Sequence, residues 1–269
     1  MSGIFGVVSK DNCLQDLFYG ADYHSHLGTE YGGIAVLSGD EFIRQIHKIS
    51  QTQFKSKFFE DYQHVKGNKG IAVISDADAQ PIYLKSKFGP FCIVTSGLIE
   101  NKEELAQDLL RAGGSLSEVN DDGSVNAAEL IAKLISQGDD IIDGIEKMFD
   151  KIKGSCSLLL LHKDGLYAAR DRWGYTPLIL GKRNEDWCVT AETNALMNLG
   201  FSAEKFLLPG EIILINEEGL AQRKPGCSEN CQICTFLWIY TGFPASSYEG
   251  INTEVVRERC GRALAPSHK

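Results

Sequence analysis

The sequence lacks long apolar runs and a surplus of basic residues, and each absence excludes a class of protein. None of its stretches reaches the roughly 18 to 20 consecutive apolar residues of a membrane-spanning helix. Its N-terminus has no basic region followed by an apolar run, so we expect no signal peptide. The formal net charge of −9 argues against nucleic acids and anionic membranes, which bind basic faces. These absences predict a cytoplasmic protein with no nucleic-acid and no membrane partner.

Internal repeats, low-complexity segments and long charge runs are also missing. The remaining composition, 43% hydrophobic and 23% charged, is typical of a globular protein that buries a core. The composition changes at Lys224-Pro225-Gly226, which is the best candidate for a boundary. We therefore predict one domain over residues 2–224 and a tail or linker over residues 225–269.

The eight cysteines are unevenly spread, and three of them lie close together in the sequence. In the cytoplasm they should be reduced unless they hold metal. Cys227, Cys231 and Cys234 could supply thiolates to an iron–sulfur cluster or to zinc, and reduced loop cysteines are the alternative. A closed site needs a fourth ligand, for which Cys260 or a residue of a further domain is available. We expect no tightly held cofactor in this chain.

The pattern of apolar residues predicts an α+β fold. Residues 4–8 form a short apolar run that is typical of a buried strand. Residues 12–23 have helical spacing, with Asn12 as a possible cap. We expect further strands at 33–37, 42–47, 70–74, 82–84, 91–95, 155–162, 166–170, 178–180, 187–190 and 212–216, and helices at 102–111, 124–136 and 140–149. Strands that flank a block of helices indicate layered sheets rather than alternating βαβ units.

The N-terminal motif carries a resemblance to a known family. Residues 2–6, Ser-Gly-Ile-Phe-Gly, resemble the Cys-Gly-Ile-Phe-Gly with which class-II glutamine amidotransferases begin once the initiator methionine is removed. The cysteine is that family's nucleophile. The resemblance therefore places Ser2 at the nucleophile position.

Further motifs resemble the glutaminase half of amidophosphoribosyltransferases. Residues 26–34 are similar to that family's His-Arg-Gly-Gln-Glu-x-Ala-Gly-Ile, and residues 170–178 to its Arg-Asp-Pro-x-Gly-x-Arg-Pro-Leu. Shorter matches continue in the same order at 191–193, 209–211 and 234–250, so the resemblance covers nearly the whole chain. It implies the four-layer α-β-β-α sandwich of the N-terminal nucleophile (Ntn) hydrolases, an α+β fold.

The resemblance also implies where glutamine hydrolysis would take place, and the residues there are substituted. A hydroxyl at Ser2 is a weaker nucleophile than the family's thiol, whose own α-amine acts as the base. The family's arginine, which binds the substrate carboxylate, falls at Ser75, a residue without charge. The Asn-Gly oxyanion hole falls at Ser96-Gly97, where only the backbone donor of Gly97 is kept. Losing one such donor typically slows catalysis by about 100- to 1000-fold.

Two more residues complete the predicted substrate site. The family's aspartate for the substrate amine belongs near Asp122, within residues 121–124, and His26 belongs to the first motif after the N-terminus. The resemblance also makes residues 254–264 the helix that leads into a phosphoribosyltransferase domain, whose acidic-pair loop is not found in these residues.

We therefore expect a purine-biosynthesis pseudoenzyme domain in which glutaminase activity is lost or weakened. Its role would be structural or regulatory, beside a phosphoribosyltransferase domain or subunit in a homo-oligomeric full-length protein. Two alternatives stay open: a serine-nucleophile Ntn amidase that acts on an unknown amide, and a cysteine-based metal-binding module.

Overall fold

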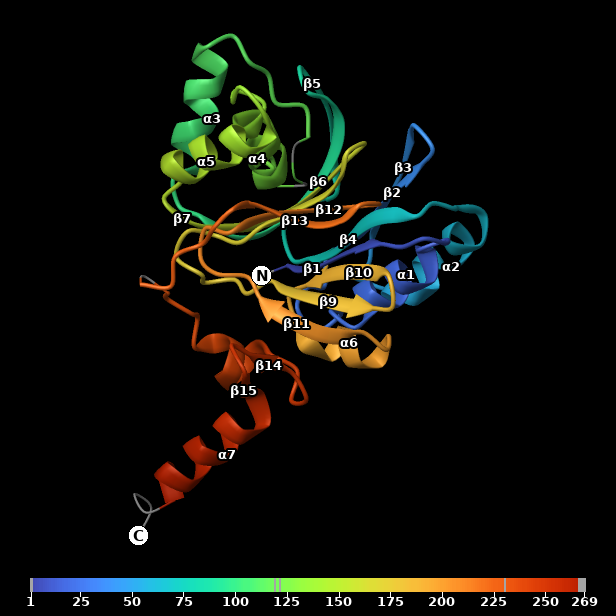
Figure 1. Ribbon diagram of the computed structural model, residues 1–269. Coiled ribbons are helices and arrows are strands. Elements are labelled where there is room, and N and C mark those ends of the chain that lie inside the picture. Colours follow the sequence, from blue (N-terminus) through green and yellow to red (C-terminus); the bar gives the residue numbers. More distant parts are fainter. Residues whose placement is uncertain (1, 119, 121, 230, 266–269) are drawn as a thin grey trace.

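Two antiparallel sheets pack face to face in the computed structural model, which describes residues 2–118, 120, 122–229 and 231–265 (Figure 1). The seven-stranded sheet has the order β11 (Ser202–Phe206), β9 (Ile179–Arg183), β10 (Asp186–Thr190), β1 (Gly3–Val8), β4 (Lys69–Ser75), β2 (Tyr31–Ser38) and β3 (Glu41–Lys48). The six-stranded sheet has the order β13 (Gly219–Lys224), β12 (Ile212–Asn216), β8 (Gly165–Ala169), β7 (Gly154–His162), β6 (Gly89–Ile99) and β5 (Ile82–Ser86).

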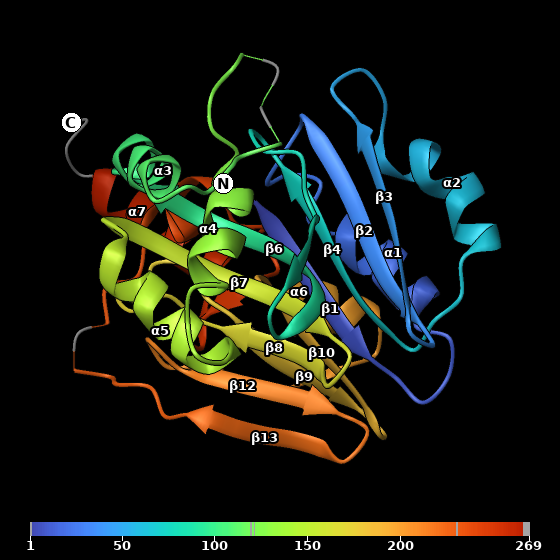
Figure 2. The ribbon, with the colours of Figure 1, turned by 90° about the horizontal axis from the view of Figure 1, so that it is seen from above.

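Helices cover the outer face of each sheet. The six-stranded sheet carries α3 (Lys102–Arg111), α4 (Ala127–Ile135) and α5 (Ile141–Lys151), which lie in front of it in Figure 2. The seven-stranded sheet carries α1 (Leu14–Asp22), α2 (Phe54–His64) and α6 (Thr193–Asn198). This order of layers confirms the predicted α-β-β-α sandwich.

Strand β1 lies at the centre of the seven-stranded sheet, between β10 and β4, and all six of its residues are buried. Ile4 and Val8 pack with Leu159 and Leu161 of the facing sheet, and burying such a side chain contributes roughly 1.5–3 kcal/mol. Gly6 allows the sheets to approach, because a Cβ at that position would lie 2.8 Å from a methyl carbon of Leu166. The predicted buried strand over residues 4–8 is therefore confirmed.

Helix starts follow their capping residues. The Asn126 side chain accepts hydrogen bonds from the amides of Ala128 and Glu129 at 3.0 and 3.2 Å. Because Asn126 is the cap, α4 begins at Ala127 and not at Ser124 as predicted. The predicted cap at Asn12 is wrong. Its Oδ1 accepts the amide of Gly67 at 3.2 Å instead, and α1 begins at Leu14.

Four elements of the sandwich were not predicted: α2, α6, β11 and β13. The two strands lie at the edges of their sheets, and most of their side chains are exposed or half-buried. Edge strands therefore carry little of the alternating apolar pattern on which the strand predictions rest.

The chain after Lys224 leaves the sandwich and forms a separate set of elements, shown in orange to red in Figure 1. They are the π-helix η1 (Leu237–Thr241), the hairpin strands β14 (Ser247–Tyr248) and β15 (Ile251–Asn252), and α7 (Thr253–Leu264). Within these elements, the side chains of Leu237, Trp238 and Tyr248 are buried together in a small apolar cluster. The last strand of the sandwich, β13, ends at Lys224; the division into two domains there stays a prediction. In the described ranges, no helix is long and apolar enough to cross a membrane.

Candidate functional site

Ser2 lies directly before β1, at the end of the strand where both sheets supply hydroxyl groups. The register pairs Gly3 with Ile74, so Ser2 meets Ser75 at the end of β4, and their Oγ atoms are 3.3 Å apart. From the facing sheet, the Ser96 hydroxyl donates to the Ser2 carbonyl oxygen at 2.6 Å. The structure thus brings together three of the predicted site residues, although they are far apart in the sequence.

Ser2 also lines a cavity of about 150 Å³ beside β6 and β7, at the first residues of α3 and α4. This volume corresponds to about five water molecules and is below the roughly 300–1,000 Å³ of pockets that enclose drug-sized ligands. The wall is made by residues Ser2, Ala77, Asp78, Gln80, Thr95, Gly97, Leu98, Ile99, Lys102, Ala127, Ser155 and Cys156. The cavity therefore suits a small polar group next to the Ser2 hydroxyl.

Gly97 lies in this wall for a steric reason. A Cβ at Gly97 would lie 2.1 Å from the carbonyl oxygen of Ser155 in the neighbouring strand β7, which no side chain tolerates. Ser75 and Ser96 are almost fully buried, touch Ser2 and do not line the cavity. Of the four predicted residues Ser2, Ser75, Ser96 and Gly97, only Ser2 and Gly97 line the cavity.

Ser75, the predicted position of the family's carboxylate-binding arginine, carries no positive charge. Ser75 is 1% exposed, and the next residue, Asp76, accepts the amide of Thr29 at 2.9 Å. Gly28 of the first motif packs on this turn, since a Cβ there would lie 2.8 Å from the Ser75 backbone. Of the described wall residues, Lys102 is the cation, and its Nζ donates to the Val125 carbonyl at 3.4 Å.

Asp122 does not line the cavity. It is exposed, and its Oδ1 accepts the Ser124 amide at 2.9 Å. Hydrogen bonds from the Ser124 side chain and, to a smaller extent, from its amide lower the pKa of the Asp122 carboxyl. Asp121, in the same predicted window, lies outside the described residues. The carboxylate in the wall is Asp78, whose Oδ1 accepts from Asn120 Nδ2 at 2.9 Å and from the Ala127 amide at 3.3 Å. Sequence reasoning missed Asp78 because a short loop carries no periodic pattern.

His26 belongs to a neighbouring buried cluster and not to the cavity wall. Its Nε2 lies 3.0 Å from Oε1 of Glu192, which is 1% exposed. The Glu192 carboxylate also accepts from the hydroxyls of Tyr248 and Ser246. Burial raises the pKa of Glu192, but the hydrogen bond and charge of His26, together with the remaining donors, outweigh burial and lower it. An ionised carboxylate is therefore held beneath the Ser2 end of the sheet.

A second residue near Ser2, His24, was also missed. Its side chain packs on Gly3, where a Cβ would lie 2.3 Å from the His24 Cβ. The ring is fully buried, and burial lowers its pKa. A histidine before the predicted motif had no signal of its own in the sequence.

Cys227, Cys231 and Cys234 are the predicted candidates for an iron–sulfur cluster or zinc. Within the described ranges, no three His, Cys, Asp or Glu side chains are grouped so that they could hold a metal ion. The segment that contains the cysteines runs along the sandwich, because the Cys227 amide bonds to Pro209 O at 2.9 Å and the Gln232 amide to Trp173 O at 2.6 Å. Burial raises the pKa of Cys231, which disfavours the thiolate that a metal requires. These residues do not fit an iron–sulfur cluster or zinc.

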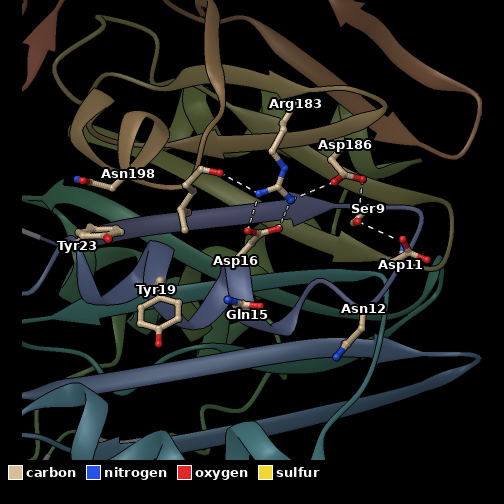
Figure 3. A pocket seen from close by; sticks show the side chains of 11 residues that line it. Ser9, Asp11, Asn12, Gln15, Asp16, Tyr19, Tyr23, Arg183, Asp186 and Asn198 are labelled. Atoms are coloured by element: carbon tan, nitrogen blue, oxygen red, sulfur yellow. Dashed lines mark hydrogen bonds and ion pairs between the residues drawn. The ribbon is translucent and has the colours of Figure 1, made fainter.

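A larger pocket lies at the other end of β1 (Figure 3). Its volume is about 560 Å³, and at its centre Arg183 binds both carboxylate oxygens of Asp16 at 2.9 and 2.6 Å. Arg183 also bonds to Asp186 at 3.1 Å, and Asp186 accepts the Ser9 hydroxyl at 2.8 Å. The charges pair with one another, so this network joins α1 to the β9–β10 hairpin.

Comparisons with known proteins agree with this architecture. The family model of a glutamine amidotransferase domain matches residues 68–198. The amidophosphoribosyltransferase of Methanocaldococcus jannaschii is 29% identical over 100% of this chain and 61% of its own length. That of Bacillus subtilis is 26% identical over 98% of this chain and 56% of its own length.

Two solved structures superpose with a TM-score of 0.89 at 25% identity, over 98% of this chain and 58% of theirs. One is an allosteric regulatory enzyme of purine biosynthesis, and the other is glutamine phosphoribosylpyrophosphate amidotransferase from Bacillus subtilis in complex with ADP and GMP. The chain thus spans about three-fifths of the length of these relatives, 61% in one case and 58% in another.

The sandwich, with its central strand beginning next to Ser2, and the match to the family model make this chain similar to class-II glutamine amidotransferase domains with the Ntn-hydrolase fold. More particularly, the chain is homologous to the N-terminal glutaminase domains of the amidophosphoribosyltransferases.

Proposed function

We propose that this chain is the glutaminase-like domain of an amidophosphoribosyltransferase-like protein of purine biosynthesis, and that its own glutamine hydrolysis is lost or strongly weakened. The contact between Ser2 Oγ and Ser75 Oγ at 3.3 Å carries the proposal. It joins the position of the family's nucleophile to the position of its carboxylate-binding arginine. Both positions hold a neutral hydroxyl.

Three chemical deficits support this proposal. A serine hydroxyl is far less nucleophilic than a thiol at neutral pH. Ser75 is buried and uncharged, so it cannot bind a substrate carboxylate as a guanidinium does. The Ser96 hydroxyl already donates to the Ser2 carbonyl oxygen and is not available to a developing oxyanion.

We further propose that the domain acts structurally or as a regulator beside a phosphoribosyltransferase domain or subunit, in a cytoplasmic homo-oligomer. The exposed apolar side chains of the C-terminal segment support a partner there. Phe236, Ile239 and Tyr240 on and beside η1 are 60%, 57% and 77% exposed. A group of exposed apolar side chains of this kind is typical of an interaction surface.

Glutamate release from glutamine tests the loss of activity. The wild-type chain and Ser2→Cys should both remain at the uncatalysed background, because the clamp and the oxyanion donor are absent. The triple variant Ser2→Cys, Ser75→Arg, Ser96→Asn should recover part of the activity. Its matched control carries Ser2→Ala with the same two other changes and should stay inactive. Wild-type turnover of about one per second, within the usual range of enzymes, would refute the proposal.

The serine amidase is the second candidate, because the Ser2 hydroxyl lines a cavity together with the backbone of Gly97. In this reading the α-amine of Ser2 is the base and its Oγ the nucleophile. Incubation with activated esters, followed by intact-mass analysis, detects an acyl group on Ser2. A Ser2→Ala variant that acylates equally well would exclude this candidate.

A further inference from the structure

The C-terminal segment is bonded to one corner of the sandwich, residues 190–194, where β10 ends and α6 begins. The hydroxyls of Tyr248 and Ser246 both donate to the Glu192 carboxylate, the latter at 3.1 Å. The Ser247 amide donates to Thr193 Oγ1 at 2.8 Å. Glu192 and Tyr248 are at most 1% exposed, so water does not compete for these bonds.

The same corner holds the N-terminal end of β1. Its Ala191 amide donates to the Ile4 carbonyl oxygen at 3.2 Å. Thr190 Oγ1 lies 3.0 Å from Nε2 of His24, whose side chain packs on Gly3. The hydrogen bond from Ala191 therefore ends at Ile4, and the contact through His24 ends at Gly3, the two residues that follow Ser2.

The hydrogen bonds of His24 fix the direction of this link. Nδ1 lies 2.7 Å from the Gly20 carbonyl oxygen, which only accepts, so Nδ1 carries the hydrogen. Burial lowers the pKa of His24 and keeps the ring neutral. Nε2 is then an acceptor, and the Thr190 hydroxyl directs its one hydrogen toward this nitrogen at 3.0 Å and the Glu192 carbonyl oxygen at 3.1 Å. The corner thus orients the ring that supports Gly3.

We propose that the corner is a positioning element, which fixes Ser2 only while the segment 243–248 is docked. Tyr248 and Ser246 are then positioning residues for Ser2, although neither touches it. If the segment undocks, the buried Glu192 carboxylate keeps His26 as its remaining side-chain donor. A buried carboxylate that loses donors is strongly destabilised, so the corner must rearrange as the segment leaves.

Periodate oxidation of the N-terminal serine tests this coupling in the intact chain after removal of Met1. Periodate cleaves the Cα–Cβ bond of a serine whose α-amine and hydroxyl are both free, and intact-mass analysis follows the product. The rate reports how often Ser2 is accessible, because oxidation requires the site to open. The measurement reads the position of Ser2 and not catalysis, so it is independent of glutaminase activity.

Matched tyrosine variants separate the corner from other contacts of the segment. Tyr248→Phe removes one donor to Glu192 and should raise the oxidation rate by about tenfold, the order expected for a hydrogen bond to a charged group. Tyr175→Phe is the control. It also breaks a hydrogen bond between the sandwich and the segment, 2.7 Å long and made to Gln232, but away from the corner. Its rate should stay within about twofold of wild type, like other exposed changes.

Ser246→Ala is a second variant, which also removes one hydroxyl donor to Glu192. It decides the question if Tyr248→Phe does not fold. It should also raise the rate. The proposal is overturned if Tyr248→Phe and Ser246→Ala lower the melting temperature but oxidise at the rate of the control. An equal rise in Tyr175→Phe overturns it as well, because any loosening of the segment would then expose Ser2.

Discussion

The buried ion pair between Arg170 and Glu249 gives the sharpest stability prediction. The Arg170 side chain is 0% exposed, and its Nη1 lies 2.7 Å from Glu249 Oε1. Nη1 also donates to the carbonyl oxygen of Leu207, and Nη2 donates to that of Gly174. The pair thus fixes the turn between β14 and β15 to the sandwich. Glu249→Gln keeps the shape of the side chain and removes its charge.

The expected loss follows from the burial of each partner. Removing one partner of a fully buried pair costs roughly 3–5 kcal/mol, because the remaining charge stays buried. Glu249 is 25% exposed and Arg170 keeps its carbonyl acceptors, so we expect about 2 kcal/mol. For a chain of this size that lowers the melting temperature by about 4–8 °C.

Thermal unfolding followed by circular dichroism measures this shift. The control is Glu258→Gln, which breaks an exposed pair with Arg262 of 2.6 Å within α7. Such helix pairs contribute about 0.3–0.5 kcal/mol, so the control should melt within about 2 °C of wild type. The reasoning is wrong if Glu249→Gln destabilises the chain no more than Glu258→Gln does.

Four further outcomes are expected. The pKa of Asp186 is held below its ordinary value of 3.8 by its hydrogen bonds to Ser9 and Arg183, which outweigh burial. Its contribution to stability is therefore present at neutral pH and is lost as the pH falls through the lowered pKa. Between about pH 6 and about pH 2.5, the free energy of unfolding measured with urea should fall more steeply in wild type than in Asp186→Asn. Gly3→Ala should cost about 1–3 kcal/mol through overlap with His24. Gly261→Ala, in an open part of α7, should instead stabilise by about 0.5–1 kcal/mol in the same assay. Aerobically purified protein should hold less than one iron or zinc per chain by elemental analysis, because the cysteines of residues 227–234 are not grouped; a stoichiometric metal retained through chelator treatment would contradict this.

Elements buried on both faces could be predicted from the sequence, because their side chains must be apolar. Residues 4–8 and the strand at 70–74 are examples, and both lie in the middle of the larger sheet. The edge strands β11 and β13 escaped prediction because most of their side chains face solvent, which accepts any polar residue. The predicted helix cap at Asn12 was wrong, because an asparagine side chain accepts a hydrogen bond from a loop amide as readily as from the first amides of a helix.

The candidate site was predictable only where family motifs mark it. Ser2, Ser75, Ser96 and Gly97 come together because β1, β4 and β6 carry them to one end of the sandwich. Asp78 was missed, since nothing in the six-residue loop between β4 and β5 tells which carboxylate faces a cavity.

The close approach of the sheets at Gly6 has a consequence for how the sequence can change over time. The methyl group of Leu166 occupies the space that a side chain at position 6 would need. A larger residue at position 6 is therefore acceptable only together with a smaller one at position 166. Substitutions at these two positions should be non-additive, so that Leu166→Val rescues part of the stability lost in Gly6→Ala. Among homologous domains the two positions should covary, although they are separated by most of the chain.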